Sequence, residues 1–294
     1  MRGIIAAVPT PINEAGAPIK DLFVEHCQWA LANGCDGLNI LGSTGEANSL
    51  DTTARRTVMG WAAAACPTNQ LMVGTGTPSL HDTIALTKHA DDLGYGVALI
   101  LPPYYYTPVS NAGLTRWYMT LHEALDARKI EIYFYNFPQM TGIGIPVEVI
   151  ADLANQAPSR FTGIKDSSGD LDFCRSVVIA NSALYVFPSS ETALKNAYAD
   201  GFAGCISATV NLTAPLCGQV WARRTAPPAD TCTEIARQRG VIAGTTLIAN
   251  VKSLVAKRTQ DARWCTILPP FLTLPEADAQ ALKIALEGQH NGKS

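Results

Sequence analysis

Short apolar runs alternate along the chain with longer stretches whose apolar positions recur at helical spacing. Several runs, such as Val97–Leu101, are continuously apolar, which is typical of strands covered on both faces in a parallel sheet. In the stretch Lys20–Asn33 the apolar residues approximate one face of a helix. The runs predict eight strands, at Gly3–Val8, Gly37–Leu41, Leu71–Gly74, Gly96–Leu101, Glu131–Tyr135, Phe161–Lys165, Leu184–Phe187 and Gly204–Ser207.

This number of strand–helix repeats predicts a (β/α)8 barrel over residues 1–225, because such barrels typically occupy about 250 residues. An open doubly wound sheet is the alternative, but no Gly-x-Gly-x-x-Gly pattern follows the first strand. After Pro227-Pro228 the texture changes, and helical segments follow at Asp230–Ile248, Asn250–Thr259 and Pro275–Gln289. Residues 226–294 are therefore predicted to form a small helical extension packed on the barrel.

Composition excludes several classes of protein. The 294 residues carry 22 Lys and Arg against 25 Asp and Glu, and no basic stripe suggests a nucleic-acid partner. The hydrophobic fraction of 47% is too high for a disordered chain. Polar residues interrupt the uncharged stretch Thr57–Leu80, so it does not read as a membrane span, and the first apolar run ends at Pro9 without a signal-peptide cleavage site. Eight dispersed cysteines without a Cys-x-x-Cys pair fit reduced thiols, so we expect a cytoplasmic protein.

Residues at the carboxyl ends of the predicted strands are the candidate chemistry, since barrel active sites form there. Lys165 closes the apolar run that begins at Phe161. An ammonium group that emerges from a buried strand needs either a partner or a function. It forms a structural ion pair with Asp166 or Glu46, or it is a desolvated amine able to form a Schiff base. The barrel position favours the Schiff base.

Two further strand ends carry polar groups. Tyr135 ends the strand before the one that carries Lys165, and its phenol could relay protons. Taken alone, Tyr135 is better explained as a core tyrosine with its hydroxyl satisfied locally, and its position beside the strand of Lys165 is what favours the relay. The turn Gly42–Glu46 (GSTGE) offers the hydroxyls of Ser43 and Thr44 and successive amides around Gly45, a concavity suited to a carboxylate. A capped tight turn would look similar.

A metal-dependent reaction is not expected. The histidines, at positions 26, 81, 89, 122 and 290, lack the spacing of a ligand set on one helix face. We expect neither a metal nor another cofactor, because a lysine imine supplies its own electron sink.

Taken in order, six motifs strongly resemble the dihydrodipicolinate synthase and N-acetylneuraminate lyase superfamily. They are Pro9–Pro11, Gly42–Glu46, Pro103–Tyr105, Tyr135–Pro138, Gly163–Asp166 and Ile206–Thr209. The resemblance covers nearly the whole chain. It implies a barrel with a helical extension, usually a homotetramer, that binds pyruvate or another 2-keto acid as an imine.

The same resemblance implies roles for individual residues. Lys165 would form the imine and Tyr135 would relay protons, with Thr44 counted among the catalytic residues as well. Ser43, Thr44 and Gly45 would hold the carboxylate, and Ile206 would lend a backbone carbonyl. Tyr105 falls where the synthases place a tyrosine that serves a neighbouring subunit.

Departures from the superfamily pattern narrow the substrate. Synthases usually carry Arg five residues after the catalytic Tyr, where this chain has Met140, which cannot bind a carboxylate bidentately. Sialic acid lyases tend to carry an Asp-Glu pair after the seventh strand, where Ser189-Ser190-Glu191-Thr192 of this chain offers one acid and more hydroxyls. The pattern looks most like 2-keto-3-deoxygluconate-type aldolases, with contacts to a polyol tail expected from Ser167, Ser189, Ser190 and Ser207.

The expected reaction is therefore reversible cleavage of a 2-keto-3-deoxy sugar acid to pyruvate and an aldehyde. The alternatives are dihydrodipicolinate synthesis from pyruvate and aspartate semialdehyde, N-acetylneuraminate cleavage, and dehydration through the same imine. A non-enzymatic alternative is a keto-acid-binding sensor.

Overall fold

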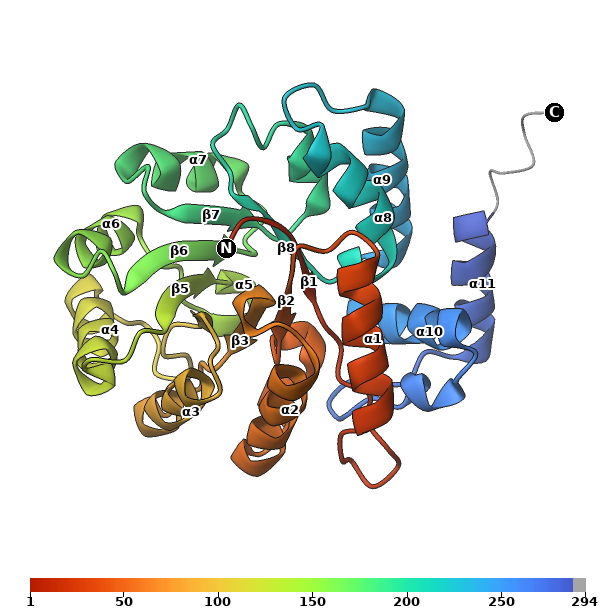
Figure 1. Ribbon diagram of the computed structural model, residues 1–294, viewed down its shortest axis with the longest axis horizontal. Helices are drawn as coiled ribbons and strands as arrows, with labels where there is room; N and C mark the ends of the chain where they lie inside the picture. Colours follow the sequence, from red (N-terminus) through yellow and green to blue (C-terminus); the bar gives the residue numbers. More distant parts are fainter. Residues whose placement is uncertain (288–294) are drawn as a thin grey trace.

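The structure, a computed structural model, describes residues 1–287. The chain forms a barrel of parallel strands surrounded by helices (Figure 1). Neighbouring strands follow the order β7-β6-β5-β4-β3-β2-β1-β8, and Ala203 N donates to Val186 O at 2.8 Å where the two ends of the sheet meet. The predicted (β/α)8 barrel is confirmed. Its strands are β1 (Gly3–Ala7), β2 (Gly37–Ile40), β3 (Leu71–Gly74), β4 (Val97–Ile100), β5 (Glu131–Asn136), β6 (Phe161–Asp166), β7 (Tyr185–Pro188) and β8 (Gly204–Ser207).

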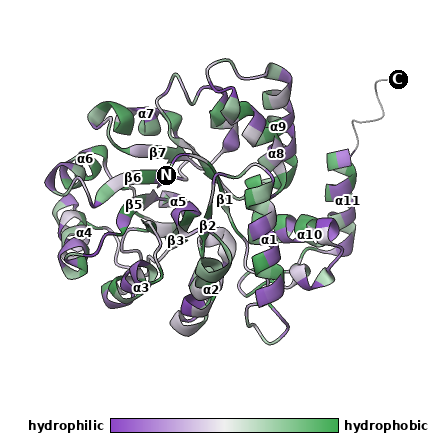
Figure 2. Ribbon diagram, in the orientation of Figure 1, coloured by the Kyte–Doolittle hydropathy of each residue, from purple (hydrophilic) through white to green (hydrophobic). Residues whose placement is uncertain are grey.

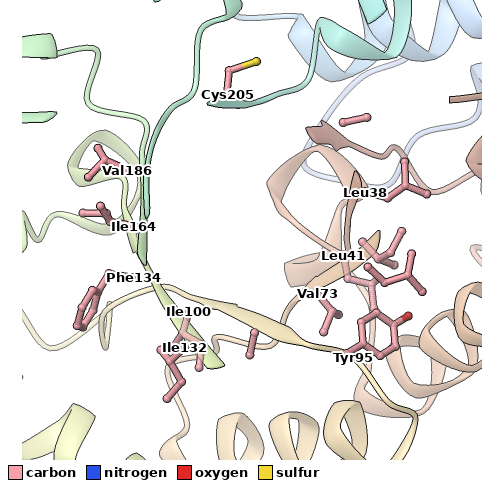
Figure 3. Close-up of a cluster of buried hydrophobic side chains, with 14 of the residues drawn as sticks. Leu38, Leu41, Val73, Tyr95, Ile100, Ile132, Phe134, Ile164, Val186 and Cys205 are labelled. Atoms are coloured by element: carbon pink, nitrogen blue, oxygen red, sulfur yellow. The ribbon is translucent and has the colours of Figure 1, made fainter. Parts of the chain in front are cut away.

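The strands are buried on both faces, as their continuous apolar runs predict. One set of side chains packs outward beneath the helices, and Figure 3 shows Leu38, Val73, Ile132 and Ile164 in this layer. A second, smaller set fills the barrel interior, with Tyr133 and Phe187 among its members. The large apolar surface removed from water on both sides stabilises the barrel.

Helices cover the outside of the barrel with their apolar faces inward (Figures 1 and 2). Side chains cap two of these helices at their starts: Asp51 accepts from Ala54 N at 2.7 Å, and Ser79 accepts from Asp82 N at 3.2 Å. The helices of the barrel are α1 (Lys20–Ala32), α2 (Thr52–Ala65), α3 (Leu80–Asp92), α4 (Asn111–Leu125), α5 (Pro138–Thr141), α6 (Val147–Gln156), α7 (Leu171–Ala180) and α8 (Val210–Ala222).

The extension consists of α9 (Ala229–Ile242), α10 (Leu247–Thr259) and α11 (Glu276–Glu287) and packs beside α1 and α8 (Figure 1). One predicted segment is wrong: helix does not continue from Asp230 to Ile248. It breaks after Ile242, where Gly244 adopts φ +149°, a conformation that a helix cannot contain. The next helix starts at Leu247 instead of Asn250, and the predicted helix end at Gln289 lies outside the described residues.

Buried polar contacts tie the extension to the barrel. Arg258 on α10 bonds His26 Nδ1 at 2.8 Å and stacks over Trp29, with 3.8 Å from its guanidinium carbon to the ring centroid. On its other side His26 Nε2 bonds Asn211 Oδ1 at 2.8 Å. Three helices, α1, α8 and α10, thus meet at one buried imidazole.

Within residues 1–287, no helix combines the length and the apolar character needed to cross a bilayer. All eight cysteines are free thiols, and six of them are buried.

Candidate active site

A cavity of about 440 Å³ opens at the carboxyl ends of the strands, roofed by the segment that joins α9 to α10. Its volume lies in the range of small-molecule binding sites, roughly 300–1,000 Å³. Most of the predicted site residues line it: Ser43, Thr44, Tyr135, Met140, Lys165, Ser167, Ser189 and Ile206.

Lys165 and Tyr135 face each other across two neighbouring strands. They are direct partners in the register of β5 and β6. The ammonium Nζ of Lys165 donates to the phenol oxygen of Tyr135 at 3.3 Å and lies 4.4 Å from the centre of its ring. Lys165 is only 4% exposed. An amine and a phenol therefore lie in contact at one buried position of the cavity wall.

The surroundings of Tyr135 act on the pKa of its phenol in opposite directions. Burial by itself raises its pKa, but the positive charge of Lys165 and hydrogen bonds from Ser43, Ser167 and Lys165 lower it. The opposing effects leave the pKa below its ordinary value of 10.0. A phenol with a lowered pKa exchanges protons more readily near neutral pH.

The structure does not realise the ion-pair alternative for Lys165. Asp166 faces away, where its carboxylate accepts from Asn136 Nδ2 at 2.7 Å and from Ser168 Oγ at 2.8 Å. Glu46 forms a buried ion pair with Lys252 of α10. Neither carboxylate neutralises Lys165, so its partner is the phenol.

The turn after β2 forms the wall opposite Lys165. Residues Ser43–Gly45 make one turn of 3₁₀ helix, and Ser43 Oγ lies 3.4 Å from the phenol oxygen of Tyr135. A Cβ at Gly42 would lie 2.6 Å from Asn39 Nδ2, so a larger residue there would require the buried Asn39 side chain to shift. Gly45 does not line the cavity; its carbonyl accepts from Thr10 Oγ1 at 2.8 Å and secures the turn from behind.

Two of the serines expected to contact a substrate tail lie elsewhere. Ser207 alternates along β8 with Ile206 and so points outside the barrel, where it donates to Glu191 at 2.7 Å. Ser190 accepts from Thr192 N at 3.3 Å and caps the turn after β7. The side chains of Ser167 and Ser189 remain as hydroxyls at the cavity wall.

Tyr105 lies outside the cavity of the single chain. It is 80% exposed, and its backbone adopts φ +97°. The centroid of its ring lies 5.2 Å from that of Tyr106. The neighbouring Tyr104 lines the cavity instead. An exposed aromatic pair on a positive-φ backbone fits a role outside its own subunit, which stays a prediction.

Sequence reasoning missed the contribution of the extension. Arg239 of α9 reaches the cavity, as do Gly244, Leu247 and Ile248 around the break between α9 and α10. Their positions depend on how the extension packs on the barrel, and no local motif marks them.

Among the described residues, no three His, Cys, Asp or Glu side chains gather in a way that could hold a metal ion.

Known proteins share both the sequence pattern and the architecture. The sequence profile of the dihydrodipicolinate synthetase family matches residues 1–288. The 4-hydroxy-tetrahydrodipicolinate synthase of Rhodospirillum centenum is 32% identical over 227 residues, 76% of each chain. The E. coli prophage protein YagE, solved in complex with pyruvate, superposes with a TM-score of 0.88 at 24% identity, covering 98% of both chains.

A variant of 2-keto-3-deoxygluconate aldolase from Sulfolobus solfataricus superposes with a TM-score of 0.87 at 21% identity, over 97% of this chain and 95% of that one. At these identities the two solved structures support the fold alone, while the profile match spans nearly the whole sequence. This chain belongs to the dihydrodipicolinate synthetase family, and it is a carbon–carbon lyase of the class I aldolase type.

Proposed function

We propose that this protein reversibly cleaves a 2-keto-3-deoxy sugar acid to pyruvate and an aldehyde through an imine on Lys165. The observation that carries the proposal is the 3.3 Å contact between Lys165 Nζ and the phenol of Tyr135 inside a buried cavity. The imine forms by attack of the Lys165 amine on the ketone, and the adjacent phenol can move the protons that this step requires.

Each step of the reaction has a group within reach. The Lys165 amine adds to the C2 carbonyl, and Tyr135 transfers the protons that let water leave the carbinolamine. The protonated imine then accepts the electron pair of the C3–C4 bond, while Tyr135 takes the proton of the C4 hydroxyl. Aldehyde and enamine result. Protonation at C3 and hydrolysis of the imine release pyruvate and restore the amine.

The inner half of the cavity suits the keto-acid end of the substrate. Ser43 and Thr44 line it opposite the amine, and the amides of their turn can bind a carboxylate. We expect the backbone carbonyl of Ile206 to contact the same end, because Ile206 lines the cavity.

The outer half of the cavity supports an aldehyde product that carries no carboxylate. Met140 occupies the helix turn after β5 and is 65% exposed at the cavity mouth. A thioether offers no donor for a second carboxylate, whereas Ser167 and Ser189 offer hydroxyls for a polyol tail. The Sulfolobus relative named above as a 2-keto-3-deoxygluconate aldolase fits the same substrate class.

A homotetramer is part of the proposal. Tyr105 and Tyr106 form an exposed aromatic pair beside the cavity mouth, and we propose that Tyr105 enters the proton relay of a neighbouring subunit. Burial of such a pair in an interface between copies would remove apolar surface from water. Sedimentation velocity of the wild type and of Tyr105→Ala would test this assembly.

The decisive experiment is borohydride trapping with pyruvate followed by peptide mass analysis. We expect a stable adduct on Lys165 in the wild type and no adduct in Lys165→Met, with unchanged circular dichroism. Absence of an adduct on the native protein, under conditions that label a known Schiff-base aldolase, would reject the proposed chemistry.

A substrate panel assigns the reaction. We expect pyruvate release from 2-keto-3-deoxygluconate to exceed that from N-acetylneuraminate. Efficient condensation of pyruvate with aspartate semialdehyde would instead assign a synthase, and a water-loss product without pyruvate would assign a dehydratase. Trapped pyruvate without turnover of any acid would point to a sensor.

A further inference from the structure

The extension places one guanidinium group at the cavity. Arg239 on α9 lines the cavity, and its Nη1 bonds Glu191 Oε2 at 2.8 Å, Thr209 Oγ1 at 2.9 Å and Ser207 Oγ at 3.0 Å. Glu191 is 0% exposed, and the same two hydroxyls and Thr213 donate to its carboxylate. The guanidinium is therefore held in one orientation by a rigid buried network.

Only one edge of this guanidinium is used by the protein. An arginine carries five N–H donors, of which two belong to Nη1. Within residues 1–287 no hydrogen bond joins Nη2 or Nε of Arg239 to another residue, and the side chain is 22% exposed. Three pre-oriented donors are left for whatever occupies the cavity or for solvent.

The charge of the cavity is nearly balanced without a substrate. Three charged side chains line it, Glu46, Lys165 and Arg239. Lys252 pairs with Glu46 and Glu191 pairs with Arg239, so both pairs are formally neutral. Of these three side chains, only Lys165 has no counter-charge among the described residues. As a protonated imine it balances a single substrate carboxylate.

We propose that Arg239 is a specificity-determining residue that donates hydrogen bonds to the uncharged hydroxyls of the substrate tail. Glu191 cancels the charge of Arg239, so the enzyme selects monoanionic 2-keto acids with a hydroxylated tail over acids with a second carboxylate. This inference rests on the proposed function, because it assigns the outer half of the same cavity. A second carboxylate would enter a low-dielectric site with no cation left to pair with it.

The test compares Arg239→Met with a control on the same helix. Arg239→Met should raise KM for 2-keto-3-deoxygluconate about 10- to 100-fold, the effect of losing hydrogen bonds from a charged donor. Labelling of Lys165 by pyruvate and borohydride should persist. Arg237→Met removes a cation two residues away that pairs with Glu234 and does not line the cavity, so its KM should match that of the wild type.

A charge variant tests the tail itself. Glu191→Gln keeps the shape of the side chain but leaves the guanidinium uncompensated. It should raise kcat/KM for 4-hydroxy-2-oxoglutarate relative to 2-keto-3-deoxygluconate by about tenfold. Pyruvate labelling reports whether this buried variant keeps its fold.

The outcomes separate this inference from the proposed function. Unlabelled wild-type Lys165 would remove the proposed function itself. Normal labelling with an unchanged KM in Arg239→Met would overturn the role of Arg239 alone. If the wild type preferred 4-hydroxy-2-oxoglutarate and Arg239→Met lost that preference, the inferred selection for an uncharged tail would be overturned. Loss of pyruvate labelling together with the rise in KM in Arg239→Met would show instead that Arg239 has only a structural role.

Discussion

Lys165 and Tyr135 meet because two parallel strands pair in register. Side chains on neighbouring strands at the same height point to the same face, so the pairing of Tyr135 with Lys165 places amine and phenol together in the barrel interior. The next residue on each strand, Asn136 and Asp166, points outward, and these two bond to each other at 2.7 Å. One alternation therefore separates a reactive pair from a structural pair.

Removal of the Tyr135 hydroxyl tests the relay. We expect Tyr135→Phe to lower kcat roughly 10²- to 10⁴-fold, because the proton of the C4 hydroxyl loses its acceptor. Pyruvate should still label Lys165, though more slowly, in a borohydride time course. Tyr118→Phe is the matched control, since Tyr118 is a buried phenol beneath the helices that donates to Ile100 O at 3.3 Å. Equal losses of kcat in the two variants would contradict the assigned relay.

At the scale of elements, α10 holds the Ser43–Gly45 turn, the proposed carboxylate site, in place. Glu46 follows this turn at φ +54°, pairs with Lys252 of α10, and accepts from Leu268 N at 2.7 Å. Glu46 and Lys252 are 0% and 1% exposed, respectively, and burial lowers the pKa of Lys252 although the charge of Glu46 raises it. The turn and the extension are thus joined by charges that cannot be satisfied by water.

Breaking this pair should affect both stability and binding. Lys252→Met leaves a buried carboxylate alone, which costs about 3–5 kcal/mol of unfolding free energy. We expect a matching loss in urea denaturation and a higher KM for the keto acid, because the turn loses its anchor. Lys257→Met on the same helix removes only the surface pair with Glu287 and should change little.

A double variant separates charge from packing. In Glu46→Gln combined with Lys252→Met no unpaired charge remains, so we expect recovery of much of the lost stability. If the double variant were less stable than Lys252→Met alone, the ion pair would not be the cause.

At the scale of the whole molecule, His26 couples the barrel to the extension. Burial lowers its pKa to about 4, the hydrogen bond to Asn211 raises it, and the nearby charge of Arg258 lowers it. The folded protein therefore binds this proton only below about pH 4, while the unfolded chain binds it below about pH 6.5. Stability from this group is present above pH 6.5 and is lost as pH falls toward 4.

The pH dependence of unfolding measures this coupling. As pH falls from 6.5 to 4, keeping the imidazole neutral should lower the free energy of unfolding by about 3 kcal/mol, which would be measured as a falling urea midpoint. The glutamine in His26→Gln cannot titrate. We therefore expect the urea midpoint of this variant to fall less steeply with pH over the same window than that of the wild type. Identical slopes in the two proteins would rule out His26 as the titrating group.

Much of the architecture follows from short-range patterns. Continuous apolar runs determine buried parallel strands, because such strands lose both faces to packing, and this predicts the barrel and the end at which its active site forms. The same local order puts Lys165, Tyr135 and the Ser43–Thr44 turn at strand ends, so the inner half of the cavity can be predicted.

The outer half is a consequence of long-range packing. Arg239 reaches the cavity only because α9 packs on α8 and the turn after β7, and Ser207 leaves it because the alternation along β8 turns it outward. The pairing of Glu46 with Lys252 likewise joins segments far apart in the chain. The periodicity of the sequence predicts which face of an element a residue occupies. The packing of the extension on the barrel decides which charged side chains pair between the two.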